Sequence, residues 1–287
     1  MSDKLIIGCG YLGRRVAKQW QQQGQQVHVL TRSPTRRDEF AAMGLTPLVG
    51  DVTSLDDAFE FPAVETCLYA IGYDRSAGID KRTVTVDGLK RVLEKLQGKV
   101  QRLIFISSSS VYGHEDGSLV DEESDTTPAT EGGQITLEAE EVVKQLNPAD
   151  GNWTILRLSG IYGPGRLLMK ADHLKSGQPL GGEPDAWLNI IHVDDAADVV
   201  LTAEQHAKPG SIYLITDDAP VPRYEYYGEL SRMIAAPPPM FDTTGPAGRT
   251  RGLNKRLSNA KMKRELGVTL RYPTFREGLF QMVAGVD

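Results

Sequence analysis

The chain of 287 residues is long enough for one large domain or two closely packed domains with a sizeable core. Its composition is 40% hydrophobic and 24% charged, and its formal net charge is −6. This balance excludes the basic surface with which a nucleic-acid-binding protein neutralises phosphates, and no apolar run approaches the roughly 18 to 20 residues of a membrane span. The N-terminal segment does not predict a signal peptide, and Cys9 and Cys67 cannot form a disulfide framework, so we expect a cytoplasmic protein.

Strand-like and helix-like segments alternate through the first half of the chain. The strand-like segments, rich in Val, Ile and Leu, are 4–8, 26–32, 45–52, 65–72 and 100–108. The connecting segments with a helix-like pattern are 12–24, 33–44, 54–60 and 81–98. This alternation predicts a parallel sheet with helices on both faces.

The second half continues this pattern and then changes. Residues 136–146 have apolar side chains at helical spacing, and 153–163 form a further strand and loop. Gly and Pro then become frequent, although 189–205 return to a strand followed by a helix and 211–218 are strand-like. We therefore predict an α/β fold, a doubly wound parallel sheet with a smaller C-terminal α/β substrate lobe. The predicted boundaries are 1–160 for the larger domain, with 186–206 returning to it, and 161–287 for the lobe.

A glycine-rich motif joins the first strand to the first helix. Gly8, Gly10 and Gly13 form G-x-G-x-x-G, with Tyr11 and Leu12 between the last two glycines. In a Rossmann dinucleotide-binding fold one glycine permits the tight turn, one lets the backbone approach the pyrophosphate, and one lets helix and strand pack closely. The helix N-terminus then offers N–H groups to the phosphates. We predict that these five residues bind a dinucleotide; the alternative is a turn without a ligand.

The end of the second strand indicates which dinucleotide binds. NAD-binding versions carry an acidic residue there for the ribose hydroxyls, whereas this chain has Thr31-Arg32, followed by Arg36 and Arg37. A guanidinium binds a 2′-phosphate bidentately and a carboxylate repels it. We therefore predict NADP as the cofactor, with Arg32 at the 2′-phosphate, and favour NAD less. The alternative is that these arginines only face solvent at the start of a helix.

Further motifs, in this order and spacing, resemble the short-chain dehydrogenase/reductase superfamily, in its extended branch of NAD(P)-dependent epimerases and dehydratases. They are "GDVTSLDD", "LYAIG", "TVTVDGLKRVLEKL", "SSSSVYG", "LRLSGIYGPGR" and "NIIHVDDAADVV", and the resemblance runs through nearly the whole chain. It implies further cofactor contacts from Asp51, Val52, Ala70, Ile71, Gly72, Ser107, Gly160 and Ile161.

The same resemblance implies where a small-molecule substrate binds. The "SSSSVYG" motif places the catalytic-type hydroxyl at Ser108. Tyr112, Tyr162 and Arg166 lie on motif loops near the expected nicotinamide end, and we predict that they bind substrate. No metal site is predicted.

The resemblance fails at one pair of residues. In the family a tyrosine donates or takes the substrate proton, and a lysine one helical turn later lowers its pKa and holds the ribose. Alignment on "LEAEE" places Gly132 at the tyrosine position and Thr136 at the lysine position, and no Tyr-x-x-x-Lys occurs anywhere in the chain. This pattern resembles the atypical, YeeZ-like group of the superfamily.

Two functions remain open. One is an NADP-dependent oxidoreductase or epimerase-like enzyme for a carbonyl or nucleotide-sugar substrate, in which Ser108 polarises a carbonyl and water or Tyr73, Tyr112 or Glu131 supplies the proton. The other is a non-enzymatic NADP(H)-binding sensor or regulatory protein. We favour the enzyme because Ser108 and the "YGPGR" loop are both present. Helices 81–98 and 138–146 resemble those that pair in family dimers, which allows a homodimer.

Overall fold

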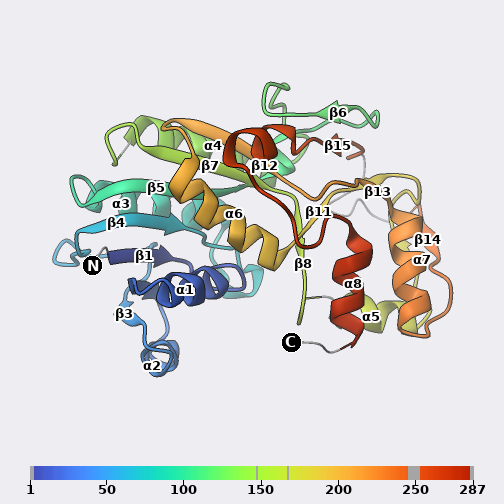
Figure 1. Cartoon of the computed structure of the whole chain (residues 1–287), viewed down its shortest axis with the longest axis horizontal. Coiled ribbons are helices and arrows are strands. Elements are labelled where there is room, and N and C mark those ends of the chain that lie inside the picture. Colours follow the sequence, from blue (N-terminus) through green and yellow to red (C-terminus); the bar gives the residue numbers. More distant parts are fainter. Residues whose placement is uncertain (1–2, 147, 167, 245–252, 285–287) are drawn as a thin grey trace.

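Seven parallel strands form the central sheet of the structure, a computed structural model that describes residues 3–146, 148–166, 168–244 and 253–284 (Figure 1). The order is β12-β7-β5-β4-β1-β2-β3, and each neighbouring pair is parallel. The strands are β1 (Asp3–Ile7), β2 (Gln26–Thr31), β3 (Thr46–Val49), β4 (Val64–Tyr69), β5 (Val100–Ser108), β7 (Trp153–Leu158) and β12 (Ser211–Ile215). The direction of winding reverses between β1 and β4, and open α/β sheets bind ligands beyond the carboxyl ends of such strands. The predicted doubly wound sheet is confirmed.

Helices cover both faces of this sheet. On one face α1 (Gly13–Gln22) packs against α6 (Val193–His206), and their buried side chains share a core with β1 and β2. On the other face lie α3 (Gly88–Lys95), the π-helical turn η2 (Thr83–Asp87) that precedes it, and α4 (Glu131–Leu146). The remaining helical elements beside the sheet are α2 (Pro34–Ala42), η1 (Arg75–Ala77), η3 (Ser109–Val111) and η4 (Met262–Leu266).

A smaller lobe with its own apolar core lies to the right of the sheet in Figure 1. Its core includes Leu174, Leu180, Leu230 and Phe275, each at most 2% exposed. The lobe contains β8 (Gly160–Tyr162), α5 (Leu168–Lys175), β9 (Leu180–Gly181), β10 (Trp187–Leu188), β11 (Ile190–His192), β13 (Val221–Pro222), α7 (Arg223–Met233), β14 (Phe241–Asp242) and α8 (Phe275–Ala284). The short pair β6 (Leu119–Val120) and β15 (Arg256–Leu257) ties the tail of the chain to the loop after β5.

Two sequence-based expectations need correction. Residues 54–60 form bends and turns, so the connection 50–63 between β3 and β4 lacks the helix that was expected there. The strand β12 belongs to the central sheet and pairs with β7, although only 186–206 of the second half were expected to return to this layer. Within the described residues, no helix is long and apolar enough to cross a membrane.

Candidate cofactor site and active site

The glycine loop brings the backbone of β1 against the end of β4. Gly8 has a φ of +97°, and a Cβ built there would lie 2.6 Å from the carbonyl carbon of Ala70. A Cβ on Gly13 would lie 2.8 Å from the carbonyl oxygen of Gly8, so helix and strand pack closely only because that side chain is missing. No described atom lies within 4 Å of a Cβ on Gly10, where the backbone therefore faces open space. These three glycines fit the distinct tasks that a pyrophosphate-binding loop requires.

The N-terminus of α1 is suited to an anion. Within the part of the chain that the structure describes, no side chain caps this helix and its first turn holds no acidic residue. Arg14 and Arg15 donate their N–H groups to the carbonyls of Gly10 and Leu12, at 3.0 Å each, so an anion at the positive end of the helix dipole would meet the N–H groups of the loop ahead of them. Leu12 is buried behind the loop, while the half-buried Tyr11 donates a hydrogen bond from its hydroxyl to the carbonyl of Pro164, at 3.0 Å. Arg166 lies 5.1 Å from the centre of the Tyr11 ring, so its charge is near the glycine loop.

The thiol inside the loop has a structural role. Cys9 is 4% exposed, and burial raises its pKa to about 11, although the nearby Arg14 and Arg36 guanidinium groups oppose that rise. A thiol with a raised pKa is a poor nucleophile at neutral pH.

Of the residues expected near the 2′-phosphate end of the cofactor, Arg32 is exposed, Asp51 is half-buried and Val52 is buried. Half of the Arg32 side chain is exposed, and its Nη2 lies 3.4 Å from Oδ2 of Asp74. Asp51 accepts hydrogen bonds from the N–H and the hydroxyl of Thr53, and Val52 is buried against the start of α3. An exposed, loosely paired guanidinium remains accessible to a phosphate group.

Two further segments border the same end of the sheet. Ala70 and Ile71 follow β4 and are half-buried, and Gly72 is exposed with no described atom within 4 Å of a Cβ. Gly160 donates its N–H to the carbonyl of Asn189 at 3.0 Å, and Ile161 packs half-buried against the core shared by α1 and α6.

The end of β5 presents two adjacent serines in different directions. Ser108 is half-buried, and its hydroxyl oxygen accepts a hydrogen bond from the N–H of Ser110 at 3.1 Å, which fixes the start of η3. Ser107 is buried and donates to Oε1 of Glu140 at 2.5 Å. The side chain of Ser107 thus faces the interior, which leaves the backbone of this residue for the predicted cofactor contact.

Glu140 is the centre of a buried polar network beneath the serine turn. Arg157 donates to both of its carboxylate oxygens, at 3.0 Å and 2.7 Å, and also to the hydroxyl of Tyr112, at 2.6 Å. Tyr112 has no exposed surface, and burial raises its pKa to about 12. Its predicted roles in substrate binding and proton donation are therefore wrong: the hydroxyl is engaged and shielded. The backbone of the same residue is also held, because the buried Lys255 donates to its carbonyl at 2.6 Å.

Tyr162 also has a packing role where substrate binding was predicted. It is 3% exposed in the core of the smaller lobe, and its hydroxyl lies 2.2 Å from the position of a Cβ on Gly278. Its ring meets that of His192 edge to face at 5.2 Å. His192 has no exposed surface, and burial lowers its pKa to about 4. Both rings join the lobe to the sheet, and the prediction that Tyr162 binds substrate is corrected.

A lysine that sequence reasoning missed fills the place of the absent pair. Lys81 donates from its Nζ to the carbonyl of Gly132 at 2.5 Å and to the hydroxyl of Thr136 at 3.4 Å. A Cβ on Gly132 would lie 3.1 Å from this Nζ. The two positions aligned with the family's tyrosine and lysine therefore share one ammonium group, supplied by a segment 51 residues earlier. Its only signal in the sequence was its place just before "TVTVDGLKRVLEKL".

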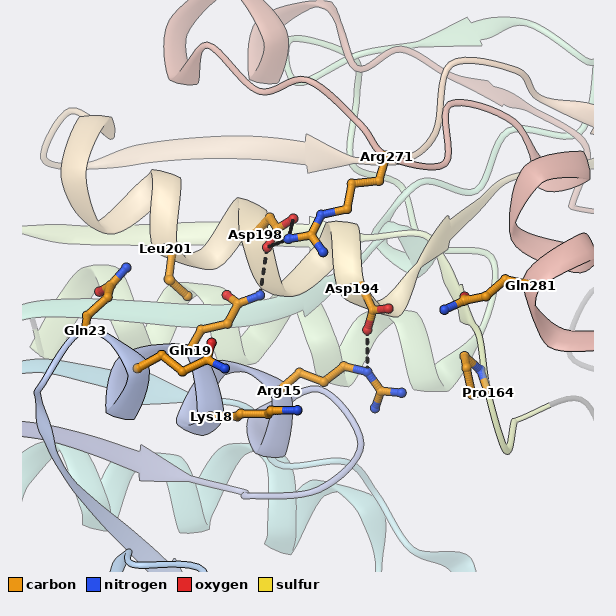
Figure 2. A pocket seen from close by; sticks show the side chains of 11 residues that line it. Arg15, Lys18, Gln19, Gln23, Pro164, Asp194, Asp198, Leu201, Arg271 and Gln281 are labelled. Carbon is orange, nitrogen blue, oxygen red and sulfur yellow. Dashed lines mark hydrogen bonds and ion pairs between the residues drawn. The ribbon is translucent and has the colours of Figure 1, made fainter. Parts of the chain in front are cut away.

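A groove of about 650 Å³, lined mostly by polar residues, lies between α1 and α6 (Figure 2). Four of its charged side chains form two ion pairs: Arg15 donates to Asp194 at 2.7 Å, and Arg271 lies 2.7 Å from Asp198. Gln19 also donates to Asp198 at 2.7 Å. These pairs join α1, α6 and the tail of the chain, and Asp194 is accounted for by this structural role.

Comparison with known proteins points to the same fold and family. The model of the NAD dependent epimerase/dehydratase family matches residues 5–216. Protein YeeZ of Escherichia coli (strain K12) is 28% identical, with 95% of this chain and 97% of YeeZ covered. A solved structure of a functionally unknown conserved protein from Silicibacter pomeroyi has a TM-score of 0.81 and 27% identity, with 99% of each chain covered.

A ketoreductase is also among the relatives. The 4-hydroxy-2-methyl-3-oxo-4-farnesyl-3,4-dihydroquinoline-1-oxide ketoreductase of Stigmatella aurantiaca is 25% identical over 225 residues, with 75% of this chain and 67% of that protein covered.

Proposed function

Because the chain belongs to the NAD dependent epimerase/dehydratase family, an atypical branch of the short-chain dehydrogenases/reductases, we propose that it is an NADP-dependent oxidoreductase or epimerase-like enzyme. The proposed substrate is a small carbonyl compound or a nucleotide sugar. One observation carries the proposal: the glycine loop and the half-buried Ser108 lie at the same, carboxyl end of the sheet, at the ends of β1 and β5. This arrangement suits a dinucleotide whose reactive end reaches the serine.

The choice of NADP rests on the charges around the loop. Arg32 is half-exposed after β2, and Arg36 is exposed in the first turn of α2. A guanidinium at either position attracts a 2′-phosphate, whereas a carboxylate there would repel it. When bound, the nicotinamide would supply or accept a hydride at the substrate carbon.

The chain's own residues would bind and orient the reactants. The α1 N-terminus and Gly10 would hold the pyrophosphate, and Arg166 lies close enough to the loop to add positive charge. The Ser108 hydroxyl would donate a hydrogen bond to the substrate oxygen while its own oxygen accepts one from Ser110. The bond from Ser110 occupies a lone pair of this oxygen and leaves the proton for a substrate carbonyl, which favours polarisation of that carbonyl.

A non-enzymatic NADP(H)-binding sensor is the second candidate, and the missing pair favours it. Gly132 and Thr136 carry no acid of useful pKa, and Tyr112 is buried. Loss of a general acid costs on the order of 10²- to 10⁴-fold in rate. A sensor would retain the glycine loop and Arg32 but would not need Ser108.

NADPH consumption and product formation with a panel of carbonyl compounds and nucleotide sugars separate the two candidates. The enzyme predicts turnover of at least one compound by the wild-type protein and a large loss in Ser108→Ala. NADPH binding without turnover of any compound would favour the sensor, and turnover that is unchanged in Ser108→Ala would refute the role of the serine.

We also propose a homodimer through α3 and α4. Where η2 and α4 meet, a groove of about 280 Å³ contains the apolar side chains of Val86, Val142 and Leu146 beside the charged Lys90 and Glu138. Light scattering after gel filtration should give twice the mass of one chain, and a monomeric mass at micromolar concentration would contradict it.

A further inference from the structure

We propose that Lys81 is the cofactor-binding cation of this protein, replacing the Tyr-x-x-x-Lys pair from a different element. Its ammonium would hold the ribose hydroxyls at the nicotinamide end of the dinucleotide and place positive charge beside Ser108. This inference rests on the proposed NADP-binding function, and it assigns a role to a residue outside the family's motif.

The contacts of Lys81 place its charge at the first turn of α4. Nζ donates to the carbonyl of Gly132 at 2.5 Å and to Oγ1 of Thr136 at 3.4 Å, and Thr136 itself donates to the same carbonyl at 2.8 Å. A tyrosine at 132 would have its Cβ only 3.1 Å from Nζ. The ammonium and a family-type tyrosine therefore compete for the same space, and Gly132 makes room for the ammonium.

The same turn of α4 lies against the serine turn. A Cβ on Gly133 would lie 2.4 Å from the carbonyl oxygen of Ser110, whose N–H is bonded to Ser108. Successive residues of an α-helix point about 100° apart, so Gly132 and Gly133 present neighbouring faces of one turn. Lys81 and Ser108 thus approach the start of α4 from adjacent sides, and a substrate oxygen bound to the serine would feel the nearby positive charge.

The backbone that carries Lys81 is held in place. Asp80 accepts hydrogen bonds from the N–H and the hydroxyl of Thr83, which caps the helix that begins at Lys81, and these bonds lower the pKa of Asp80. Tyr73 donates to the carbonyl of Ile79 at 3.1 Å and so anchors the preceding loop. The π-helical turn η2 follows directly, and such turns are frequent at functional sites. Tyr73, one of the expected proton donors, is thereby assigned a positioning role.

The neighbouring basic side chain, Arg82, has a different environment from that of Lys81. Lys81 is half-buried, and the next residue, Arg82, is exposed and pairs with Asp87 and Glu138 on the outside of the helices. Two adjacent basic residues thus point to different places: Arg82 links η2 to α4 at the surface, and Lys81 reaches under the first turn of α4.

Binding measurements on Lys81→Met and Lys81→Ala test this role without any substrate. NADPH contains the nicotinamide ribose, whereas 2′,5′-ADP contains only the adenosine end. We expect the Kd for NADPH to rise about 10- to 100-fold in both variants, as for the loss of charge-assisted hydrogen bonds, while the Kd for 2′,5′-ADP stays within about twofold. Unchanged binding of 2′,5′-ADP also shows that the variants are folded. The control is Lys208→Met, an exposed lysine in the loop before β12, which should leave both values unchanged.

Thr136→Lys in the Lys81→Ala protein provides a rescue, because it returns an ammonium to this place from α4. We expect NADPH binding to recover to within about fivefold of the wild-type value, which a purely structural role of Lys81 would not predict. An NADPH affinity in Lys81→Ala and Lys81→Met equal to that of the wild type would overturn the inference. Failure of the wild-type protein to bind NADPH or 2′,5′-ADP would instead refute the proposed function itself.

Discussion

Glu140→Gln should strongly destabilise the protein, because it leaves a buried guanidinium without its counter-charge. Glu140 has no exposed surface and Arg157 is 3% exposed. Two hydrogen bonds from Arg157 and one from Ser107 reach the carboxylate, at 3.0, 2.7 and 2.5 Å. The substitution keeps the volume of the side chain but removes its charge. Breaking a buried ion pair from one side costs about 3–5 kcal/mol, a large part of the 5–15 kcal/mol by which domains are typically stable.

Urea denaturation of Glu140→Gln and of its neighbour Glu141→Gln measures this cost. Glu141 is half-exposed and pairs with Lys144 across one helical turn, so its loss should change the free energy of unfolding by less than about 1 kcal/mol. The two variants change the same chemical group at adjacent positions of α4 and differ mainly in burial. A cost for Glu140→Gln no greater than that for Glu141→Gln would refute the view that this buried pair holds α4 against the serine strand.

NADPH should bind more tightly than NADH by about 1–3 kcal/mol if Arg32 contacts the 2′-phosphate, and fluorescence titration that shows a preference unchanged in Arg32→Ala would contradict this. Gly8→Ala should abolish NADPH binding, because the new Cβ would lie 2.6 Å from the backbone of Ala70. Gly24 also has a positive φ but has open space around it, so Gly24→Ala should lower only the stability of the protein. Equal NADPH binding by the two variants would contradict the role of the glycine loop in cofactor binding. Ser108→Ala should lower turnover by about 10²-fold or more while NADPH affinity stays within about twofold, as steady-state kinetics and titration can show. Burial lowers the pKa of His192 to about 4, so below pH 6.5 the unfolded chain takes up a proton on this residue more readily than the folded protein. The free energy of unfolding should therefore fall by on the order of 2–3 kcal/mol as the pH drops from about 6.5 towards 4. If urea unfolding of His192→Gln shows the same fall between these pH values, the assignment is refuted.

Local sequence patterns predicted the fold and the tight glycine turn after β1 well because their causes are local. The β1–α1 glycines have positions determined by one strand and one helix that are adjacent in sequence, and the alternation of strands and helices fixes a parallel sheet. The edge strand β12 was the exception, since a single apolar run of five residues does not reveal which strand it will pair with.

The direction of each side chain near the serine turn was harder to predict. Ser107 and Ser108 are adjacent on a strand, and only the positions of Glu140 and Arg157 show that the first faces inward. Tyr112 was expected to bind substrate because its motif lies near the nicotinamide end in the family, but its side chain is buried and its hydroxyl accepts a hydrogen bond from Arg157. Lys81 was missed because 51 residues separate it from Gly132, and a contact at that distance depends on the packing of η2 on α4.

A structure of the wild-type protein with NADPH tests the central claim most directly, namely that one dinucleotide extends from the glycine loop to the serine turn. The account predicts the pyrophosphate over Gly10 and the α1 N-terminus, the 2′-phosphate at Arg32, and the nicotinamide ribose within hydrogen-bond distance of Lys81 with the ring beside Ser108. A dinucleotide bound elsewhere, or with its nicotinamide remote from Ser108, would contradict it.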